Sequence, residues 1–411
     1  PRPAGPSARC AIYLCHKSNR LCHPIWRMGI DHGTTVVNSN DIDWPIPDHP
    51  QQTRIRMTPL DRIIRERIAL DGPMRVSDFM QICLLHPEHG YYVKNPAFGV
   101  QGDFITAPEI SQMFGELLGL CLAQAWMDQG APEVFHLLEL GPGRGTLMSD
   151  ILRATRSVPG LHRAADITLL EASDTMQKRQ QHTLSGYKVK WISSLDELAE
   201  KPIFVVANEF FDALPIRQYV RVGDVWHERL IGAQDNQLGF GLSPVAQTAD
   251  YLQTRLDDTQ HGDIVEVSEA TQSVIGQLSK HIQTHGGYAL IIDYGDWTSK
   301  GDTLQAVVDH QYSNVLHALG DADLTAHVDF EQIATASHCA VSKMCTQQEL
   351  LERLGISHRT QTLVTSAANE AQKNDVISAY RRLTHEEEMG TLFKAISLFP
   401  QNGPCPTGFE A

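Results

Sequence analysis

A glycine-rich segment between two regularly patterned runs is the feature that most limits how this chain can fold. The apolar run Val134–Leu140 leads into Gly141-Pro-Gly-Arg-Gly145, and Thr146–Arg156 follows with the spacing of a helix. Glycine lets the backbone turn sharply and approach a ligand closely, and the first turn of a helix favours a negatively charged group. The segment therefore predicts a strand, a ligand-binding loop and a helix in succession.

Further apolar runs alternate with helical patterns along the chain. Because a strand that is apolar throughout is buried on both faces, this alternation predicts a parallel sheet with helices on either side, which is an α/β fold. The stretch 217–267 interrupts the alternation with a pattern that turns at Gly223-Asp224, which predicts a β-rich insertion. The other predicted strands are Ile167–Glu171, Ile203–Ala207 and Tyr288–Asp293, and the other predicted helices are Thr175–Thr183 and Ser268–Thr284.

The region before the sheet has helical patterns. Apolar residues from Leu60 to Ile68 fit one helix face, and Thr106-Ala-Pro-Glu109 is a capping-box pattern that predicts the start of a long helix reaching Trp126. A second capping-box pattern, Thr346-Gln-Gln-Glu349, predicts a late helix. We therefore divide the chain into a helical N-terminal cap over 57–132 and an α/β domain over 133–411 that contains the insertion.

Residues 1–56 show no apolar period and are expected to be a disordered extension. Their first 30 positions carry five basic side chains and no acidic one, a bias typical of a mitochondrial targeting segment, but no amphipathic helix is evident. The alternative is an upstream extension, with Met57 as the natural start.

Charge and cysteine usage argue against several classes of function. The formal net charge is −15 and no basic cluster is present, so nucleic-acid binding is not expected. No apolar run is long enough to cross a bilayer, so membrane insertion is not expected either. Cys10, Cys15 and Cys22 lie near His16 and His23, but their spacing matches no zinc pattern. We therefore predict no metal site.

The glycine loop favours one cofactor over another. A dinucleotide-binding loop needs glycine or alanine five residues after its first glycine, and this chain has Thr146 there. The pattern Glu-x-Gly-x-Gly-x-Gly is instead similar to the first motif of class I methyltransferases, which implies S-adenosyl-L-methionine as the cofactor. An acid at the end of the next strand can accept both ribose hydroxyls. The alternatives are a structural turn and an ordinary exposed carboxylate. The candidate residues are Glu139, Gly141, Gly143, Gly145 and Glu171.

Three motifs in order resemble one family. Gly102–Glu116, Glu139–Gly145 and Asn208–Pro215 together resemble the MidA/NDUFAF7 family of class I methyltransferases, and His86–Tyr92 and Asp323–Phe330 extend the resemblance. The resemblance implies a seven-stranded Rossmann-like sheet. It further implies methyl transfer to an arginine guanidinium of a respiratory complex I subunit. The location would then be the mitochondrial matrix in a eukaryote or the cytoplasm in a bacterium.

The motif Asn208-Glu-Phe-Phe-Asp-Ala-Leu-Pro215 is where a substrate is expected, because open α/β sheets bind ligands at the carboxyl ends of their strands. Glu209 and Asp212 are expected on one face of a helical turn, where two carboxylates can hold a guanidinium and accept its proton. The alternative is that Glu209 caps a following helix and Asp212 is solvated. The catalytic candidates are Asn208, Glu209 and Asp212.

Two further groups of residues are candidates through the resemblance. The segment containing Asp103, Thr106 and Ser111 would fold over the cofactor, with Asp103 facing the methionine ammonium. In the late motif, His327 and Asp329 would line the substrate cleft. Alternatively, Thr106 serves only as a helix cap and His327 is structural.

Two other functions stay open at this point. One is methylation of a small molecule or of a different protein side chain, and the other is a cofactor-binding assembly chaperone without catalysis. The intact Gly141, Gly143, Gly145 and Glu171 argue against the second, since a decayed loop usually loses its glycines.

Overall fold

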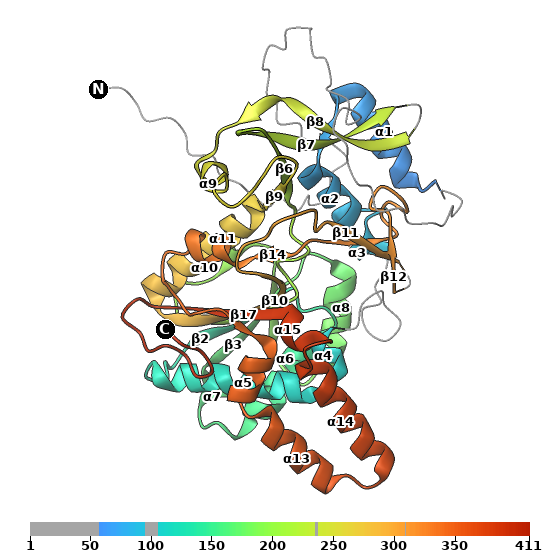
Figure 1. Cartoon of the computed structure of the whole chain (residues 1–411). Helices are drawn as coiled ribbons and strands as arrows, with labels where there is room; N and C mark the ends of the chain where they lie inside the picture. Colours follow the sequence, from blue (N-terminus) through green and yellow to red (C-terminus); the bar gives the residue numbers. More distant parts are fainter. Residues whose placement is uncertain (1–56, 95–105, 235–236, 309) are drawn as a thin grey trace.

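The structure is a computed structural model that describes residues 57–94, 106–234, 237–308 and 310–411. The predicted extension over 1–56 and the candidate residue Asp103 lie outside these residues. Figure 1 shows the central sheet with its helices in the lower part of the view and the inserted strands in the upper part.

Nine strands form the central sheet, and its main path runs β15-β17-β10-β5-β2-β3-β4. Strands β4, β3, β2, β5 and β10 run parallel to one another, whereas β17 is antiparallel to β10. The predicted α/β class is confirmed, but the sheet has nine strands rather than seven, since two short strands, β14 and β16, pair with β10 and β17. The bounds are β2 (Phe135–Leu140), β3 (Ala165–Leu170), β4 (Val189–Ile192), β5 (Ile203–Asn208), β10 (Gly287–Asp296), β14 (Val328–Asp329), β15 (Ala340–Val341), β16 (Cys345–Thr346) and β17 (Phe393–Phe399).

The register of three neighbouring strands brings distant parts of the sequence to one edge. Leu140 of β2 lies opposite Ala207 of β5, and Asn208 lies opposite Ile292 of β10. The glycine loop after β2, the motif that starts at Asn208 and the residue Asp293 therefore meet at the carboxyl end of the sheet.

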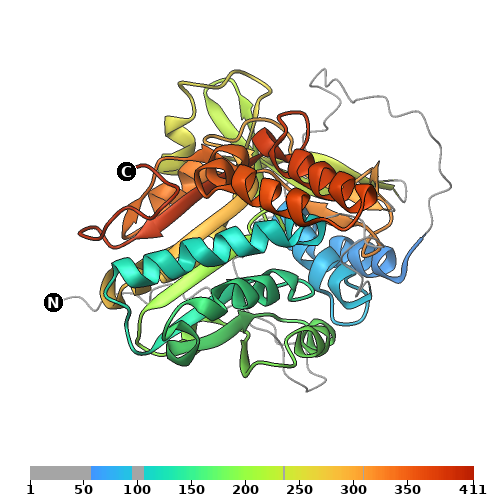
Figure 2. The ribbon, with the colours of Figure 1, turned by 90° about the horizontal axis from the view of Figure 1, so that it is seen from below.

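Helices cover both faces of the central sheet, which is why its inner strands carry apolar residues on both faces. Successive residues of a strand enter opposite cores: Leu137 of β2 belongs to the core with α5 and α6, and Leu138 belongs to the core with α10. Figure 2 shows α5 lying along the sheet. On the first side are α5 (Gln112–Asp128), α6 (Thr146–Ala154), α7 (Leu161–Ala164) and α12 (Gln347–Arg353), and on the second are α10 (Glu269–His285) and α11 (Phe330–Ala336).

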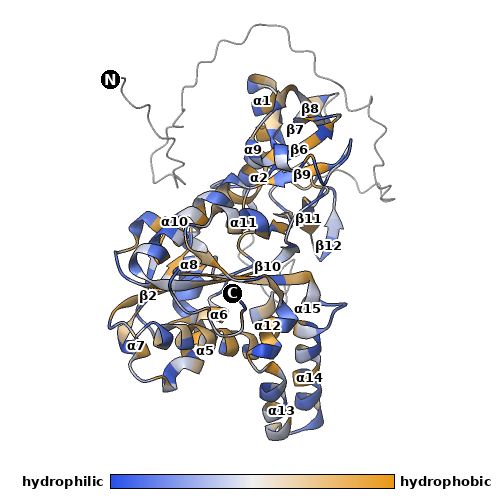
Figure 3. Ribbon diagram, turned by 60° about the vertical axis from the view of Figure 1, so that its left-hand side comes forward, coloured by the Kyte–Doolittle hydropathy of each residue, from blue (hydrophilic) through white to orange (hydrophobic). Residues whose placement is uncertain are grey.

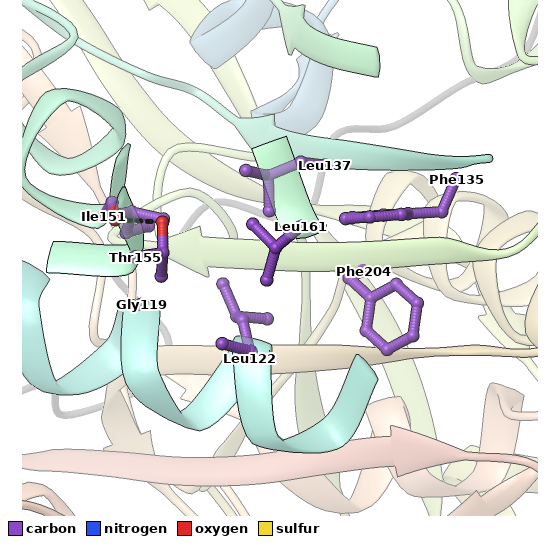
Figure 4. Close-up of a pocket in the computed structure, with 9 residues that line it drawn as sticks. Gly119, Leu122, Phe135, Leu137, Ile151, Thr155, Leu161 and Phe204 are labelled. Atoms are coloured by element: carbon purple, nitrogen blue, oxygen red, sulfur yellow. Dashed lines mark hydrogen bonds between the residues drawn. The ribbon is translucent and has the colours of Figure 1, made fainter. Parts of the chain in front are cut away.

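Helices α5 and α6 pack closely because α5 carries glycine at two contact positions. A Cβ on Gly115 would come 2.6 Å from Asp150 Cβ, and one on Gly119 would come 2.9 Å from Ile151 Cα. This close packing fixes α6 and therefore the glycine loop from which α6 starts. An apolar cavity of about 10 Å³ remains between these helices and the sheet (Figure 4), which is room for about one water molecule and not for a cofactor.

The helix predicted from Thr106 to Trp126 is two helices. Helix α4 (Ala107–Ile110) ends at Ser111, whose backbone is extended with φ −160° and ψ 137°, and α5 begins at Gln112. The Ser111 hydroxyl accepts a hydrogen bond from the Met113 backbone at 3.2 Å and so caps α5. The prediction of a single helix is therefore wrong, because Ser111 supplies an internal N-cap.

The predicted insertion is a second sheet, with the order β1-β7-β6-β9 and with β8 paired to β7. Its β6–β7 hairpin is confirmed, because Val222 pairs with Val225 and Gly223 turns between them with φ 64°. The bounds are β1 (Met74–Arg75), β6 (Arg217–Val222), β7 (Val225–Gln234), β8 (Gln237–Gln247), α9 (Asp250–Thr254) and β9 (Ile264–Val267). A third sheet, with the order β12-β11-β13, consists of β11 (Gln305–Val308), β12 (Gln311–Ser313) and β13 (Asp323–Thr325).

The first three helices pack on these smaller sheets. They share a core with Ile231 of β7 and Leu324 of β13, whereas α5 belongs to the core of the central sheet. The segment 57–132 is thus divided between the two parts of the molecule. The bounds are α1 (Pro59–Asp71), α2 (Val76–Leu85) and α3 (Tyr91–Lys94).

Helices α13 (Ile356–Ser366) and α14 (Glu370–Thr384) form a hairpin that extends away from the sheet (Figure 1). Helix α14 is mostly hydrophilic (Figure 3). The late capping box is confirmed: Thr346 and Glu349 exchange hydrogen bonds at the start of α12. The remaining bounds are α8 (Asp174–Thr183), α15 (Met389–Leu392) and two 3₁₀ turns, η2 (Thr155–Ser157) and η3 (Leu195–Glu197).

Among the residues that the structure describes, no helix combines the length and the apolar character that a membrane span requires. In the same ranges, no three or more His, Cys, Asp or Glu side chains gather so that they could hold a metal ion.

Candidate functional site

The glycine loop after β2 adopts a backbone that glycine takes most readily. The angle φ is 61° at Gly141, 49° at Gly143 and 81° at Gly145. A Cβ on Gly143 would meet no described residue within 4 Å, whereas one on Gly141 would come 2.9 Å from the Phe210 ring. The loop therefore presents bare backbone to open space at Gly143 and lies against the Asn208–Pro215 motif at Gly141.

Glu139, two residues before the loop, is a buried carboxyl group with spare capacity to accept hydrogen bonds. Its side chain is 3% exposed, and its Oε2 accepts no hydrogen bond from any described residue. Burial raises the pKa of Glu139 to about 8, opposed by a hydrogen bond from the Met148 backbone. A cationic group of a ligand would stabilise the ionised form of this carboxyl.

Glu171 follows β3 at the same edge of the sheet. The Ser173 backbone donates to its Oε1 at 2.7 Å, and Gln180 Nε2 donates to its Oε2 at 2.9 Å. Burial raises the pKa of Glu171 despite these hydrogen bonds. Each oxygen keeps capacity for a further hydrogen bond, which is what a pair of neighbouring hydroxyl groups on a ligand requires.

Helix α4 connects the glycine loop to the Asn208–Pro215 motif. On one side, Glu109 accepts a hydrogen bond from Thr146 Oγ1 at 2.6 Å and lies 3.6 Å from the Arg144 guanidinium. On the other side, the backbone N–H of Ala107 donates to Glu209 Oε1 at 3.2 Å. A displacement of α4 would therefore affect both the loop and Glu209.

The capping box predicted at Thr106 is absent, because its two side chains are not used for capping. Thr106 makes no side-chain hydrogen bond to the start of α4, and Glu109 is held by Thr146 and Arg144 instead. Glu209 supplies a carboxylate to the first N–H of α4 in place of Thr106. Glu209 thus does cap a helix, but an upstream one rather than the following helix that the alternative interpretation required.

Glu209 has a left-handed backbone with φ 51°, which is uncommon for a residue other than glycine. Its N–H donates to the Ile292 carbonyl at 3.0 Å, and its carboxylate accepts a hydrogen bond from Asn208 Nδ2 at 2.9 Å. Burial and then the nearby Asp212 raise the pKa of Glu209 to about 7, opposed by the hydrogen bonds from Asn208 and Ala107. A carboxyl group with this pKa can exchange a proton near neutral pH.

Asp212 lies in a turn that leads to β6, and no helix contains it, so the predicted helical turn is wrong. Its side chain is 7% exposed, and its Oδ1 accepts no hydrogen bond in the described part of the chain. Burial raises the pKa of Asp212 to about 6, opposed by a hydrogen bond from Tyr294. The alternative of a solvated Asp212 is therefore also wrong.

Asp293, which the sequence did not single out as a site residue, shapes this turn. Its Oδ2 accepts the backbone N–H groups of Phe210, Phe211 and Asp212 at 3.2, 2.9 and 3.3 Å, and its Oδ1 accepts that of Tyr294 at 2.9 Å. Three successive N–H groups can point at one oxygen only if the chain bends around it. Asp293 therefore holds the backbone between Glu209 and Asp212 in its bent form.

The three carboxyl groups Glu209, Asp212 and Asp293 form one cluster at the carboxyl ends of β5 and β10. Burial, followed by the charges of Asp212 and Glu209, raises the pKa of Asp293. No Lys, Arg or His of the described residues forms an ion pair with any of the three. A buried acidic cluster without a basic partner suits a ligand that brings its own positive charge.

His327, one of the two late candidates, lies behind this cluster. Its ring is edge-on to the Tyr294 ring, with 5.3 Å between the centroids, and Tyr294 in turn hydrogen-bonds to Asp212. Burial lowers the pKa of His327, so the neutral imidazole is favoured near neutral pH. His327 is thus connected to the cluster through its contact with Tyr294.

Asp329, the other late candidate, is the N-cap of α11. Its carboxylate accepts hydrogen bonds from the Gln332 backbone at 2.9 Å, the Ser299 backbone at 3.0 Å and the Tyr251 hydroxyl at 2.9 Å, and it lies 3.9 Å from Arg255. These contacts give Asp329 a structural role that needs no substrate.

Comparison with known proteins decides the family. A family model for S-adenosyl-L-methionine-dependent methyltransferases matches residues 117–346. This chain belongs to that family. It is 34% identical over 373 residues to the mitochondrial protein arginine methyltransferase NDUFAF7 of Rattus norvegicus, covering 84% of this chain and 85% of the relative. Identity to the Homo sapiens protein of the same name is also 34%, covering 84% of each chain.

A solved structure supports the same assignment. The crystal structure of a COG1565 superfamily member and likely methyl transferase from Burkholderia thailandensis, bound to S-adenosyl-homocysteine, is similar with a TM-score of 0.72 at 26% identity, covering 85% of this chain and 94% of that chain. The resemblance drawn from the motifs is thus confirmed, and so is S-adenosyl-L-methionine as the cofactor of this methyltransferase. The bare backbone at Gly143 and the spare acceptors of Glu139 and Glu171 fit such a cofactor.

Proposed function

We propose that this methyltransferase transfers methyl groups from S-adenosyl-L-methionine to an arginine guanidinium of a protein substrate. The observation that carries the proposal is the buried cluster of Glu209, Asp212 and Asp293, which has no basic partner among the described residues. A guanidinium stays protonated and offers five N–H donors in a plane, so it suits a site with several carboxylate oxygens. The names of the curated relatives, protein arginine methyltransferases, support the same chemistry.

The cofactor is assigned to the residues around the glycine loop. Gly141, Gly143 and Gly145 approach its methionine end with their backbone, Glu139 faces the ammonium group, and Glu171 accepts the ribose hydroxyls. When bound, S-adenosyl-L-methionine supplies an electrophilic methyl group on a sulfonium sulfur. Of the two candidates that flank α4, Ser111 caps α5, whereas Thr106 makes no capping hydrogen bond, so Thr106 is the better candidate for the cofactor.

The substrate is assigned to the residues that follow β5. Glu209 and Asp212 hold the guanidinium and orient one nitrogen, and Asn208 holds the Glu209 carboxylate through its Nδ2. A nitrogen that gains a methyl group must lose a proton, and Glu209, with a pKa near 7, accepts it directly or through a water molecule. Asp293 is assigned no direct contact with cofactor or substrate; its role is to fix the turn that carries both acids.

The proposed partner is a subunit of respiratory complex I, as the family resemblance implies. The relatives in animals are named as mitochondrial, so we propose the mitochondrial matrix for a eukaryotic source and the cytoplasm for a bacterial one.

Transfer of a tritiated methyl group into purified complex I subcomplexes tests this function. After acid hydrolysis, label is expected in methylarginine with the wild-type protein and to be lost with Glu209→Gln. Label in a different residue or in a small molecule would identify a different acceptor. Binding of S-adenosyl-L-methionine without any transfer would identify a non-catalytic assembly chaperone.

A further inference from the structure

A glutamine on α8 lies fully buried beneath the glycine loop. Helix α8 is mostly polar, and only Met176 and Gln180, one helical turn apart, are buried in it; Gln180 has no exposed surface. A Cβ on Gly145 would come 3.5 Å from Gln180 Cγ, so the side chain packs against the loop itself. A buried amide in this position must have partners, because an unpaired one is costly.

Gln180 has a partner for each end of its amide. Nε2 donates to the Gly143 carbonyl at 2.8 Å and to Glu171 Oε2 at 2.9 Å, and Oε1 accepts from Trp191 Nε1 at 2.8 Å. The indole N–H is only a donor, and the carbonyl and the carboxylate are acceptors. The amide therefore has a single orientation that satisfies all three groups, and Trp191 selects it.

These hydrogen bonds join two parts of the cofactor site. Gly143 belongs to the loop after β2, at the proposed methionine end of the site. Glu171 follows β3 and is the acid at the proposed ribose end. The second glutamine of α8, Gln177, donates only to the Glu171 backbone carbonyl, at 3.0 Å. Of the two, only Gln180 reaches the Glu171 carboxylate.

The choice of a neutral amide matters for the charge of Glu171. The groups that donate to its carboxylate are the Ser173 and Ala172 backbones and the Gln180 amide, and no Lys or Arg of the described residues pairs with it. An arginine here would occupy both oxygens and neutralise the charge. An amide holds one oxygen and leaves acceptor capacity on both.

We propose that Gln180 is a positioning residue for the cofactor: it fixes the Glu171 carboxylate relative to the Gly143 carbonyl, and so sets the geometry with which the ribose hydroxyls are bound. This inference rests on the proposed role of Glu171 as the ribose-binding acid. It assigns to Gln180 an effect on cofactor affinity that depends on the ribose hydroxyls, which a residue that merely fills the core would not have.

The test measures calorimetric affinities for S-adenosylhomocysteine and for its 2′,3′-dideoxy analogue, which lacks the ribose hydroxyls. Gln180→Met keeps the length of the side chain and removes its hydrogen bonds. We expect this variant to bind S-adenosylhomocysteine about ten- to a hundredfold more weakly than the wild-type protein does. Its affinity for the analogue should be nearly the same as that of the wild-type protein. Gln177→Met, on the same helix, is the matched control and should change both affinities by less than about threefold.

A second variant covers the case in which Gln180→Met does not fold. Trp191→Phe keeps most of the packing and removes the N–H donor that orients the Gln180 amide. We therefore expect a smaller loss of affinity for S-adenosylhomocysteine, about threefold, and no loss of affinity for the analogue. A loss that is equal for both ligands in the folded variant would overturn the role of Gln180.

Glu171→Gln separates this inference from the assignment on which it rests. If Glu171→Gln weakens the binding of S-adenosylhomocysteine and of the analogue equally, Glu171 does not bind the ribose hydroxyls. The proposed roles of Glu171 and of Gln180 then both fail. If Glu171→Gln discriminates between the two ligands and neither Gln180→Met nor Trp191→Phe does, only the role of Gln180 is overturned. Discrimination by all three variants supports it.

Discussion

Glu209 Oε1 accepts a hydrogen bond from the backbone N–H of Ala107 at 3.2 Å, across 102 residues of sequence. Two residues after Ala107 in α4, Glu109 binds Thr146 at the start of α6, directly after the glycine loop. One short helix therefore contacts both the cofactor loop and the proposed catalytic acid. The motif around α4 and the motif at Asn208 consequently belong to one site.

The substitution Glu209→Gln should separate catalysis from capping. Glutamine keeps an oxygen that can accept the hydrogen bonds from Ala107 and Asn208, so stability should change by only about 1 kcal/mol. It removes the charge that holds a guanidinium and the base that takes its proton, so methyl transfer should fall by on the order of a hundredfold or more. Single-turnover transfer at saturating cofactor, measured beside a melting curve, checks both values.

Glu133→Gln is the control for this substitution, because Glu133 is an exposed glutamate. It should leave transfer and melting unchanged. Near-normal transfer by a less stable Glu209→Gln protein would mean that Glu209 only caps α4 and that the proton goes to another group, with Asp212 the next candidate.

The pH dependence of kcat/KM should follow the ionisation of Glu209. The pKa of Glu209 is raised to about 7, and only the ionised form can hold a guanidinium or accept a proton. Because kcat/KM reports the free enzyme, it should rise with pH up to about pH 7 and then level off. The inflection should be missing from the residual activity of Glu209→Gln. A flat profile in the wild-type protein between pH 5 and pH 9 would contradict the assignment; these limits bracket the raised pKa by about two units on either side.

The local part of the architecture was predictable because each signal was contained in a short segment. Strand β2 is apolar at both Leu137 and Leu138, which enter cores on opposite faces, and that pattern alone indicates a sheet covered on both sides. The glycine loop is likewise contained within a few residues, and its position between β2 and α6 follows directly from the sequence.

What the sequence could not predict depends on contacts between distant segments. The patterns Thr106–Glu109 and Thr346–Glu349 look alike, yet only the second is a capping box, because Glu109 is held by Thr146 and Arg144. Asp293 likewise belongs to an ordinary, mostly apolar strand, β10. Its role appears only because β10 lies beside β5, which brings it to the turn after Asn208.

The substitution Asp293→Asn should disrupt this turn. Both oxygens of Asp293 accept backbone N–H groups, and asparagine must point its own N–H₂ group at one of these donors. We expect a loss of about 2 kcal/mol in the free energy of unfolding, together with a marked fall in kcat at little change in cofactor affinity. Asp296→Asn, which affects a similar local hydrogen bond to Trp297 at an exposed position, is the control and should be nearly neutral. Unchanged kcat in a folded Asp293→Asn protein would refute the role of Asp293.

The substitution Gly143→Val should abolish cofactor binding while the protein remains folded. Its side chain would occupy space over the loop that no described residue fills, and valine disfavours the positive φ of 49°. Gly223→Val is the matched control, because Gly223 has φ 64° and equally open surroundings in the β6–β7 turn, far from the loop in sequence. Melting curves should show a similar loss of stability for both variants. Calorimetry should show a loss of cofactor binding for Gly143→Val alone. Normal binding by that variant would place the cofactor elsewhere.

The substitution Glu139→Gln should have opposite effects on stability and on cofactor binding. Burial raises the pKa of Glu139 from 4.5 to about 8, so the folded protein holds a proton that the unfolded chain has released. The stability of the wild-type protein is therefore expected to fall as the pH rises from about 4.5 to about 8, by a few kcal/mol in total. Glutamine removes this titration and can still accept the hydrogen bond from Met148, so the ligand-free variant should be the more stable protein above pH 8.

Cofactor binding should respond in the reverse direction, because an ammonium group near Glu139 Oε2 gains from the negative charge. The affinity of Glu139→Gln for S-adenosylhomocysteine should be about tenfold or more below that of the wild-type protein at alkaline pH. The difference should narrow as the pH falls and the wild-type carboxyl takes up its proton. Melting curves and calorimetry over the same pH series measure both effects. A variant that is more stable above pH 8 but binds S-adenosylhomocysteine with wild-type affinity would show that Glu139 is a buried structural carboxyl and does not face the cofactor.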